Sequence, residues 1–267
     1  MGTLVCFHAH PDDESIATGG TMAEASEAGH RVVLVLGTRG EHGEVAEGFL
    51  DLGESLGMRR VAETFESADI LGVHRVEFLG YVDSGMVGEP TNESPYAFWQ
   101  ADVDHAARRL ATILEEEQPD VFTVYDDHGG YGHPDHIQVH RVGVRAAELA
   151  GVTRVFEATM NRDAIKASIE ASRDRLPEGS QPDLDDADLD DDFGSPEEII
   201  THAVDVTGFL TQKKQSMKAH ASQITEDSFF LQMPDDVFET AFGTEWFIER
   251  TGARSADQGF GASLFGT

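Results

Sequence analysis

The chain begins with a short apolar run that stops at polar residues. Residues 3–8 are Thr-Leu-Val-Cys-Phe-His, and residues 31–36 repeat the pattern as Arg-Val-Val-Leu-Val-Leu. Residues 21–28, between the two runs, follow helical spacing. Continuous apolar runs of this length are typical of parallel strands that are covered on both faces. The pattern therefore predicts a strand, a helix and a second strand parallel to the first.

The same alternation continues through the first half of the chain. Two helical patterns stop at Gly72 and Gly151, and glycine is the usual residue just after a helix. The further predicted elements are helices over residues 53–71, 102–117 and 137–150 and strands over residues 76–79 and 120–124. Strands separated by helices form right-handed crossover units, so we expect an α/β fold, with a Rossmann-like, mostly parallel sheet flanked by helices.

The second half of the chain is less regular. Residues 204–218 predict a helix and residues 229–248 an aromatic-rich packed region, which together form a smaller C-terminal lobe. Residues 173–198 are acidic, lack the ligand spacing of an EF-hand, and favour a solvated loop. We therefore expect a single domain over residues 1–267 with an acidic loop insert at about 173–198.

Length and composition fit a globular enzyme. With 267 residues, of which 40% are hydrophobic, the chain can bury a sizeable core. It has no apolar run of about 18 residues and no basic leader, which predicts a cytoplasmic protein without a membrane span. Its one cysteine, Cys6, lies within a predicted strand and is expected to be a core residue. The sequence leaves open whether the chain forms a homo-oligomer.

The formal net charge of −31 at pH 7 is the most unusual feature of the composition. Such a field repels phosphate backbones and anionic lipid surfaces, so we expect no nucleic-acid and no membrane partner. Carboxylates keep a surface hydrated and salt screens their mutual repulsion, so the charge also favours an acidic proteome adapted to a salty cytoplasm.

Four polar loops follow the predicted parallel strands, over residues 10–14, 38–44, 80–85 and 125–136. In a doubly wound sheet, ligands bind at the carboxyl ends of the strands. We therefore expect the polar side chains of these loops to converge on one edge of the sheet.

The first and fourth loops contain the residue types of a metal site. A catalytic zinc takes three nitrogen or oxygen ligands and keeps one position open. His10 and Asp13 are three residues apart at a strand-to-helix turn, and His136 of the fourth loop can complete the set. Pro11 and Pro134 each push the preceding histidine, His10 or His133, into an extended conformation and stiffen both loops. The pattern predicts Zn²⁺, with Fe²⁺ as the alternative that ligand type alone does not separate.

The remaining polar residues of the two loops suit hydrolysis of an amide. Asp12 can act as the general base toward a metal-activated water. His133 can protonate a leaving amine or stabilise an oxyanion, and Asp135 can hold the His133 ring in one orientation. A lone His-Pro or Asp-Asp is usually only a turn, but two His-Pro-Asp elements after two predicted parallel strands argue against coincidence. A dinucleotide site is disfavoured because Gly-x-Gly-x-x-Gly is absent.

The two motifs also carry a family resemblance. His10-Pro11-Asp12-Asp13-Glu14 and His133-Pro134-Asp135-His136 resemble the signatures of the LmbE-like, or PIG-L, family of zinc-dependent N-deacetylases. Residues 36–45, 79–86, 130–132 and 217–223 are similar to the actinobacterial branch that includes the mycothiol-biosynthesis deacetylase and the mycothiol S-conjugate amidase. The resemblance covers nearly the whole chain except the acidic insert.

The resemblance implies the metal and catalytic roles given above, and it adds further residues. Tyr131 matches a tyrosine that can swing in to polarise the carbonyl group. Arg60 matches an arginine that contacts polar groups of the substrate, a solvated helix position being the alternative. Asp83 is expected to meet sugar hydroxyls, and Glu44 and His220 are candidates for the pocket rim.

The expected function is removal of an acetyl or other acyl group from the amide nitrogen of an N-acetylglucosamine-type sugar conjugate. The partner would then be a small-molecule N-acyl amino sugar. One alternative is an amidase that cleaves thiol S-conjugates. An alternative of another class is a sugar-binding protein that no longer turns its ligand over, although such a protein would not need Asp12 and His133.

Overall fold

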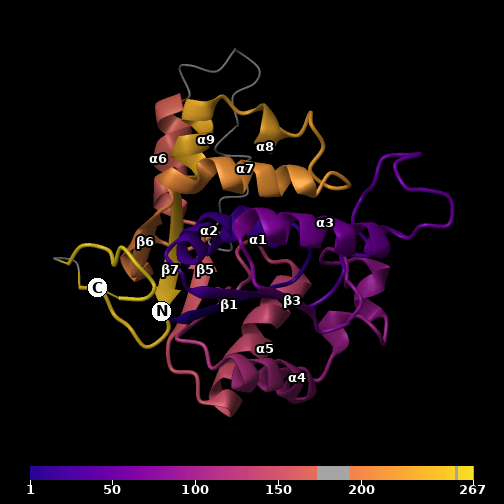
Figure 1. Cartoon of the computed structure of the whole chain (residues 1–267), viewed down its shortest axis with the longest axis horizontal. Coiled ribbons are helices and arrows are strands. Elements are labelled where there is room, and N and C mark those ends of the chain that lie inside the picture. The colour runs from indigo at the N-terminus through magenta and orange to yellow at the C-terminus, as the bar shows by residue number, and fades with distance from the viewer. Residues whose placement is uncertain (173–192, 256–257, 267) are drawn as a thin grey trace.

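A computed structural model describes residues 1–172, 193–255 and 258–266 of the chain (Figure 1). Its centre is one seven-stranded sheet of order β3-β2-β1-β4-β5-β7-β6. The expected mostly parallel α/β fold is therefore confirmed. Most of the expected acidic insert lies outside the described residues.

The five strands β3, β2, β1, β4 and β5 pair in parallel. The last two pairings along the sheet are antiparallel. β7 pairs antiparallel with both β5 and β6. The strands are β1 (Thr3–His8), β2 (Arg31–Leu36), β3 (Arg75–Phe78), β4 (Val121–Tyr125), β5 (Val155–Thr159), β6 (His202–Asp205) and β7 (Thr244–Glu249).

Helices cover both faces of the sheet. In Figure 1, α1, α2 and α3 lie on one side, α4 and α5 lie on the other, and α7 to α9 form a further layer beyond α3. The α-helices are α1 (Asp13–Ala17), α2 (Gly19–Glu27), α3 (Leu56–Leu71), α4 (Val103–Glu117), α5 (Pro134–Ala150), α6 (Arg162–Ser172), α7 (Leu210–Ala219), α8 (Phe229–Gln232) and α9 (Asp235–Phe242). Short 3₁₀ turns are η1 (Pro90–Glu93), η2 (Phe98–Gln100), η4 (Glu197–Ile199) and η5 (Thr207–Phe209).

Alternate residues of β1 contribute to two separate cores, because successive side chains of a strand point to opposite faces. Val5 and Phe7 pack in the core that includes α4 and α5. Leu4 and Cys6 pack in the core on the α2 side. Both faces of this strand are thus covered, as its uninterrupted apolar run predicts, and Cys6 is a fully buried core residue as expected.

The strand order places the two expected loops at the same edge of the sheet. β1 lies between β2 and β4, so the chain leaves β1 toward one side of the sheet and β4 toward the other. Such a switch point at the carboxyl ends of parallel strands is where ligands bind in open α/β sheets. α5 begins at Pro134, three residues before the predicted start, so the second motif opens this helix.

The C-terminal lobe differs from its prediction. The helix predicted over residues 204–218 is wrong at its start, because Val204 lies in β6 and the helix α7 begins only at Leu210. A four-residue strand is too short for periodicity to separate it from a helix. The core of the lobe consists of Met217, Ile224, Met233 and Phe238.

A buried ion pair joins this lobe to the start of α2. Lys213 Nζ lies 2.5 Å from Glu245 Oε1, and the two side chains are 1% and 3% exposed. The Glu245 carboxylate also accepts the backbone amides of Gly20 and Thr21, each at 2.8 Å. A buried carboxylate needs such partners, so the pair fixes β7 and α7 against α2.

A carboxylate at the end of α4 gives the fold a testable acid sensitivity. Glu117 accepts from Arg31 Nε at 2.6 Å and from Arg75 Nη1 at 2.8 Å. These bonds, that from Arg31 first, lower the pKa of Glu117 to about 2 from its usual 4.5. Because the folded-state pKa is depressed, the stabilisation is present above pH 4.5 and is lost as pH falls from 4.5 toward 2. We expect the unfolding free energies of the native protein and of Glu117→Gln, measured by denaturant titration, to converge over that range.

The control for this measurement is Glu115→Gln, at an exposed position two residues earlier on α4. Its difference from the native protein should change little with pH. A gap between native protein and Glu117→Gln that stays constant down to the acid transition would contradict the role assigned to the two arginines.

Candidate active site

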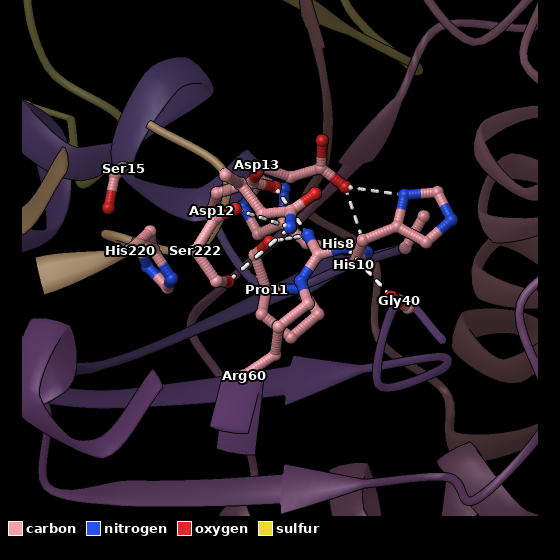
Figure 2. A network of polar contacts seen from close by, with 12 residues as sticks. His8, His10, Pro11, Asp12, Asp13, Ser15, Gly40, Arg60, His220 and Ser222 are labelled. Atoms are coloured by element: carbon pink, nitrogen blue, oxygen red, sulfur yellow. Dashed lines mark hydrogen bonds and ion pairs between the residues drawn. The ribbon is translucent and has the colours of Figure 1, made fainter. Parts of the chain in front are cut away.

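The first motif forms a sharp turn between β1 and α1. β1 ends at His8, and α1 begins at Asp13 with Asp12 at its N-cap position. Asp12 has a φ of 102°, in the left-handed region that residues other than glycine rarely adopt. Figure 2 shows the turn with the side chains of Arg60 and His220 on either side of it.

The second motif caps helix α5. The backbone amide of Asp135 donates to His133 Nδ1 at 3.1 Å, so the imidazole serves as the N-cap group. Pro134 occupies the first turn, where a missing amide hydrogen costs nothing. Asp135 and His136 follow in the same turn and are buried at the carboxyl end of β4.

Of the three predicted metal ligands, Asp13 lies close to each of the other two. Asp13 Oδ2 lies 3.3 Å from His10 Nδ1 and 3.4 Å from His136 Nε2. A tetrahedral site with ligand bonds of about 2.0–2.2 Å has ligand-to-ligand edges of about 3.3–3.6 Å, so these spacings fit a divalent cation. Burial raises the pKa of Asp13, but the imidazoles of His136 and His10 hold it well below its usual range. The donor set, two imidazoles and one carboxylate, suits zinc or iron.

The predicted set is not one of the groups in the described part of the chain whose ligand atoms all lie within 4.8 Å of one another. In the described part of the chain, His10, His133 and His136 offer ligand atoms within 4.8 Å of one another, and so do His10, Asp83 and Asp135. Both groups share His10, but Asp83 and Asp135 face its Nε2 whereas Asp13 faces its Nδ1, so they are alternative ligand sets on either side of this ring. The role of each ligand at this centre stays a prediction.

Asp135 has different partners from those expected. Its carboxylate accepts from Ser84 Oγ, from the Ser84 amide at 2.9 Å and from His10 Nε2 at 3.1 Å. It therefore orients His10, whereas the prediction had it orient the ring of His133; the bond to that ring comes from the Asp135 backbone. A proton held on His10 Nε2 leaves Nδ1 free to bind a metal.

Asp12 is placed as a partly accessible carboxylate. Its side chain is 18% exposed, and its Oδ1 lies 3.2 Å from Arg60 Nη2. Burial raises the pKa of Asp12 to about 6, even though Arg60 acts in the opposite direction. A carboxylate with a pKa close to neutral pH is suited to general base chemistry.

His133 is held as a neutral imidazole. Burial, with the nearby His10 and His136, lowers the pKa of His133 to about 4. Because its Nδ1 accepts from a backbone amide, the proton of the neutral ring lies on Nε2. Of the two roles expected for His133, this arrangement favours donation of a hydrogen bond to an oxyanion.

Tyr131 lies at the mouth of the site. Its side chain is 45% exposed, and its hydroxyl is 3.5 Å from His136 Nε2. Gly130 and Gly132, on either side of it, have positive φ values of 77° and 86°. The tyrosine is thus on a tight glycine loop beside a predicted metal ligand.

Of the predicted rim residues, only Glu44 is exposed. Arg60 is 3% exposed and donates to the carbonyls of Pro11 and Gly40 (Figure 2). Asp83 is 4% exposed and accepts the amides of Gly85 and His42, and His220 is 0% exposed against Glu14. The sequence suggested that these three side chains contact a substrate. In the structure each of them bonds to buried polar groups of the protein.

Sequence reasoning missed several supporting residues. Tyr125 stacks on the His136 ring with an interplanar angle of 8° and a centroid distance of 4.4 Å. Its hydroxyl lies 2.8 Å from His8 Nδ1, and His8 Nε2 lies 2.8 Å from Thr18 Oγ1. Ser84 holds Asp135 as described above. Ser84 and Tyr125 do lie in the polar loops that end two parallel strands, which was the available signal.

No helix among residues 1–172, 193–255 and 258–266 has the length and apolar character needed to cross a membrane.

Comparison with known proteins gives one family match and several full-length relatives. The model of the family described as "PIG-L: GlcNAc-PI de-N-acetylase" matches residues 5–147. A protein of Acidothermus cellulolyticus named 1D-myo-inositol 2-acetamido-2-deoxy-alpha-D-glucopyranoside deacetylase is 43% identical over 257 residues, which span 92% of this chain and 88% of that protein.

Solved structures share the fold with different activities. N,N'-diacetylchitobiose deacetylase from Pyrococcus horikoshii is 28% identical with a TM-score of 0.53, over 89% of this chain and 73% of that one. A 4-carboxy-2-hydroxymuconate hydratase from Pseudomonas putida KT2440 is 18% identical with a TM-score of 0.61, over 97% of this chain and 100% of that one. Because a hydratase has this fold too, the fold alone does not define the reaction.

Proposed function

This chain belongs to the PIG-L family of GlcNAc-PI de-N-acetylases, and we propose that it is a metal-dependent hydrolase that deacetylates an N-acetylglucosamine-type sugar conjugate. The observation that carries the proposal is the position of one Asp13 oxygen between His10 Nδ1 and His136 Nε2, with Asp12 next to it in sequence. The near full-length relative that is named as a sugar deacetylase supports the same reaction class.

We assign the metal to His10, Asp13 and His136, with zinc as the ion and iron(II) as the alternative. The two distances from Asp13 Oδ2, to His10 Nδ1 and to His136 Nε2, suit either ion. When bound, a divalent cation supplies a Lewis acid for the amide carbonyl and lowers the pKa of a water molecule. Asp135 and Asp83, near His10 Nε2, hold that ligand in the required orientation.

Asp12 removes a proton from the attacking water. Its ion pair with Arg60 limits the rotation of the carboxylate, so the base is held in one direction. Water oxygen adds to the carbonyl carbon, and the proton taken by Asp12 is then available to the departing nitrogen. The carbon–nitrogen bond breaks to release acetate and the free amine.

His133 and Tyr131 act on the carbonyl oxygen. Negative charge grows on this oxygen as water adds, and a hydrogen bond from His133 Nε2 stabilises it without a proton transfer. Tyr131 can supply a second donor, because its hydroxyl lies 3.5 Å from Nε2 of the predicted ligand His136. Glu44, on the exposed loop, is assigned to the substrate rim.

A substrate panel tests the proposal. We expect the metal-loaded protein to release acetate and primary amine from the inositol-linked N-acetylglucosamine in the relative's name, with a kcat/KM at least about tenfold above that for a cysteine S-conjugate amide. The measurement is amine appearance matched to acetate. Preference for the S-conjugate would favour the amidase, and metal-loaded protein that binds N-acetyl sugars without amine release would favour a binding protein.

A further inference from the structure

Asp12 has an unusual backbone that needs support. In the described part of the chain, Asp12 and Gln118 are the only residues other than glycine with a positive φ. Gln118 ends helix α4, where a left-handed residue is common, but Asp12 lies at the start of a helix. A residue in this conformation persists only when its surroundings enforce it.

The Glu14 side chain supports the backbone of Asp12. Its Oε2 accepts the backbone amide of Asp12 at 2.9 Å. Its Oε1 accepts from Ser67 Oγ at 2.6 Å and from Ser15 Oγ at 3.1 Å. The Glu14 side chain is 0% exposed, so its carboxylate is stabilised by protein donors and not by solvent.

His220 holds Glu14 from the opposite end of the chain. Its Nε2 lies 2.6 Å from Glu14 Oε1, and both side chains are 0% exposed. It is the C-cap residue of α7 and therefore belongs to the C-terminal lobe, 206 positions along the chain from Glu14. In the view of Figure 2, His220 and His10 lie on opposite sides of Asp12, so the predicted metal centre and this support flank the same turn.

The lobe segment around His220 is docked a second time on α3. Ser222 donates from its amide at 2.9 Å and from its hydroxyl at 2.6 Å to the buried Glu63 carboxylate. Glu63 is one turn from Arg60, whose guanidinium pairs with the Asp12 side chain. Asp12 is thus held at its backbone through Glu14 and His220 and at its carboxylate through Arg60.

We propose that the buried Glu14–His220 pair is a positioning device for Asp12, so that turnover depends on docking of residue 220 of the C-terminal lobe. The pair does not touch the substrate; it acts through the direction in which Asp12 faces. The inference rests on the proposed function, in which Asp12 is the general base.

Two substitutions at position 220 separate positioning from packing. His220→Gln can keep an N–H donor close to the position of Nε2, whereas His220→Phe keeps the ring shape and removes the donor. We expect His220→Phe to lower kcat by about 10- to 100-fold with KM and metal content unchanged, because displacing a reacting group by about 1 Å has effects of this size. His220→Gln should recover most of the lost kcat.

The matched control is Phe238→Leu, which leaves a cavity in the core of the same lobe without touching Asp12, Glu14 or Arg60. It should lower the melting temperature while kcat stays at the native value. If His220→Phe and Phe238→Leu lower kcat equally at equal losses of melting temperature, or if His220→Gln is no better than His220→Phe, the pair has only a structural role and the inference fails.

Asp12→Asn, assayed in parallel, keeps this outcome apart from failure of the proposed function. If Asp12→Asn is inactive and His220→Phe is fully active, the general base stands and the positioning device is wrong. If Asp12→Asn is fully active, the base assignment within the proposed function is wrong, and the inference that depends on it falls as well; absence of amine release by the native protein would instead refute the proposed function.

Discussion

Asp12→Asn should lower kcat by about 10²- to 10⁴-fold, the range expected when a general base is removed. Asparagine has nearly the same shape and is among the residues that tolerate a left-handed backbone, so the turn and the contact with Arg60 can persist. The side chain of Asp12 is 3.2 Å from Arg60 and is not among the predicted metal ligands. We therefore expect KM and the metal content per chain to stay close to native values. Steady-state amine release and elemental analysis are the two measurements.

The matched control is Asp51→Asn, at a carboxylate that is 90% exposed and pairs with Arg59 on the outer surface. It removes the same charge and should leave turnover unchanged. Turnover of Asp12→Asn within a few-fold of the native value would refute the base assignment. A simultaneous loss of metal would mean that the substitution damages the centre, and position 12 would then have to be assigned to metal binding.

The parallel half of the fold could be predicted because its signals are local and repeated. The apolar run over residues 31–36 forms β2 at the predicted bounds. Gly72 and Gly151 both end helices in the left-handed conformation, as their positions indicated. Each of these signals depends on a few neighbouring residues, so neither long-range contacts nor tertiary context was needed to interpret it.

The C-terminal part was less predictable because its strands pair over long distances in the sequence. β7 pairs with β5 and β6, and β6 has only four residues. Val204 and Val206 belong to a core with Phe247, but nothing in their immediate neighbourhood separates that arrangement from the first turn of a helix. Residues 202–205 can be assigned as a strand only once their pairing with β7 is known.

The candidate site shows the same division. The two His-Pro-Asp motifs and the strand-end rule were enough to predict that Asp13 lies close to His10 and to His136. The partner of each polar side chain was not available from the sequence, since it depends on contacts such as that between Asp135 and Ser84. Burial was the second missing quantity: Arg60 is a charged helix residue by sequence and a 3% exposed residue in the structure.

The sequence and the structure place His220 differently. By sequence, His220 belongs to a segment similar to one family branch and was assigned to the pocket rim. In the structure it is fully buried on Glu14, one residue after the predicted ligand Asp13. A buried imidazole 206 residues from its partner links the integrity of the lobe to the geometry of the motif. Substitutions that displace residue 220 should therefore change turnover even where no substrate contact is altered, whereas substitutions elsewhere in the lobe core should not.

Removing the metal should abolish turnover, and single substitutions should identify the ligands. We expect chelation followed by desalting to remove activity and zinc or iron(II) to restore it.

Asp13→Asn and His136→Gln should lose most of their metal, because three ligands are the minimum for a catalytic zinc site and loss of one leaves two. His133→Gln should keep its metal and lose activity, because His133 is assigned to the carbonyl oxygen. The opposite result, with metal retained by Asp13→Asn and lost by His133→Gln, would replace the predicted set by His10, His133 and His136, whose ligand atoms lie within 4.8 Å of one another. Metal loss only in Asp83→Asn and Asp135→Asn would move the centre to the carboxylates beside His10 Nε2, and the general base would then have to be sought again among the residues facing that point.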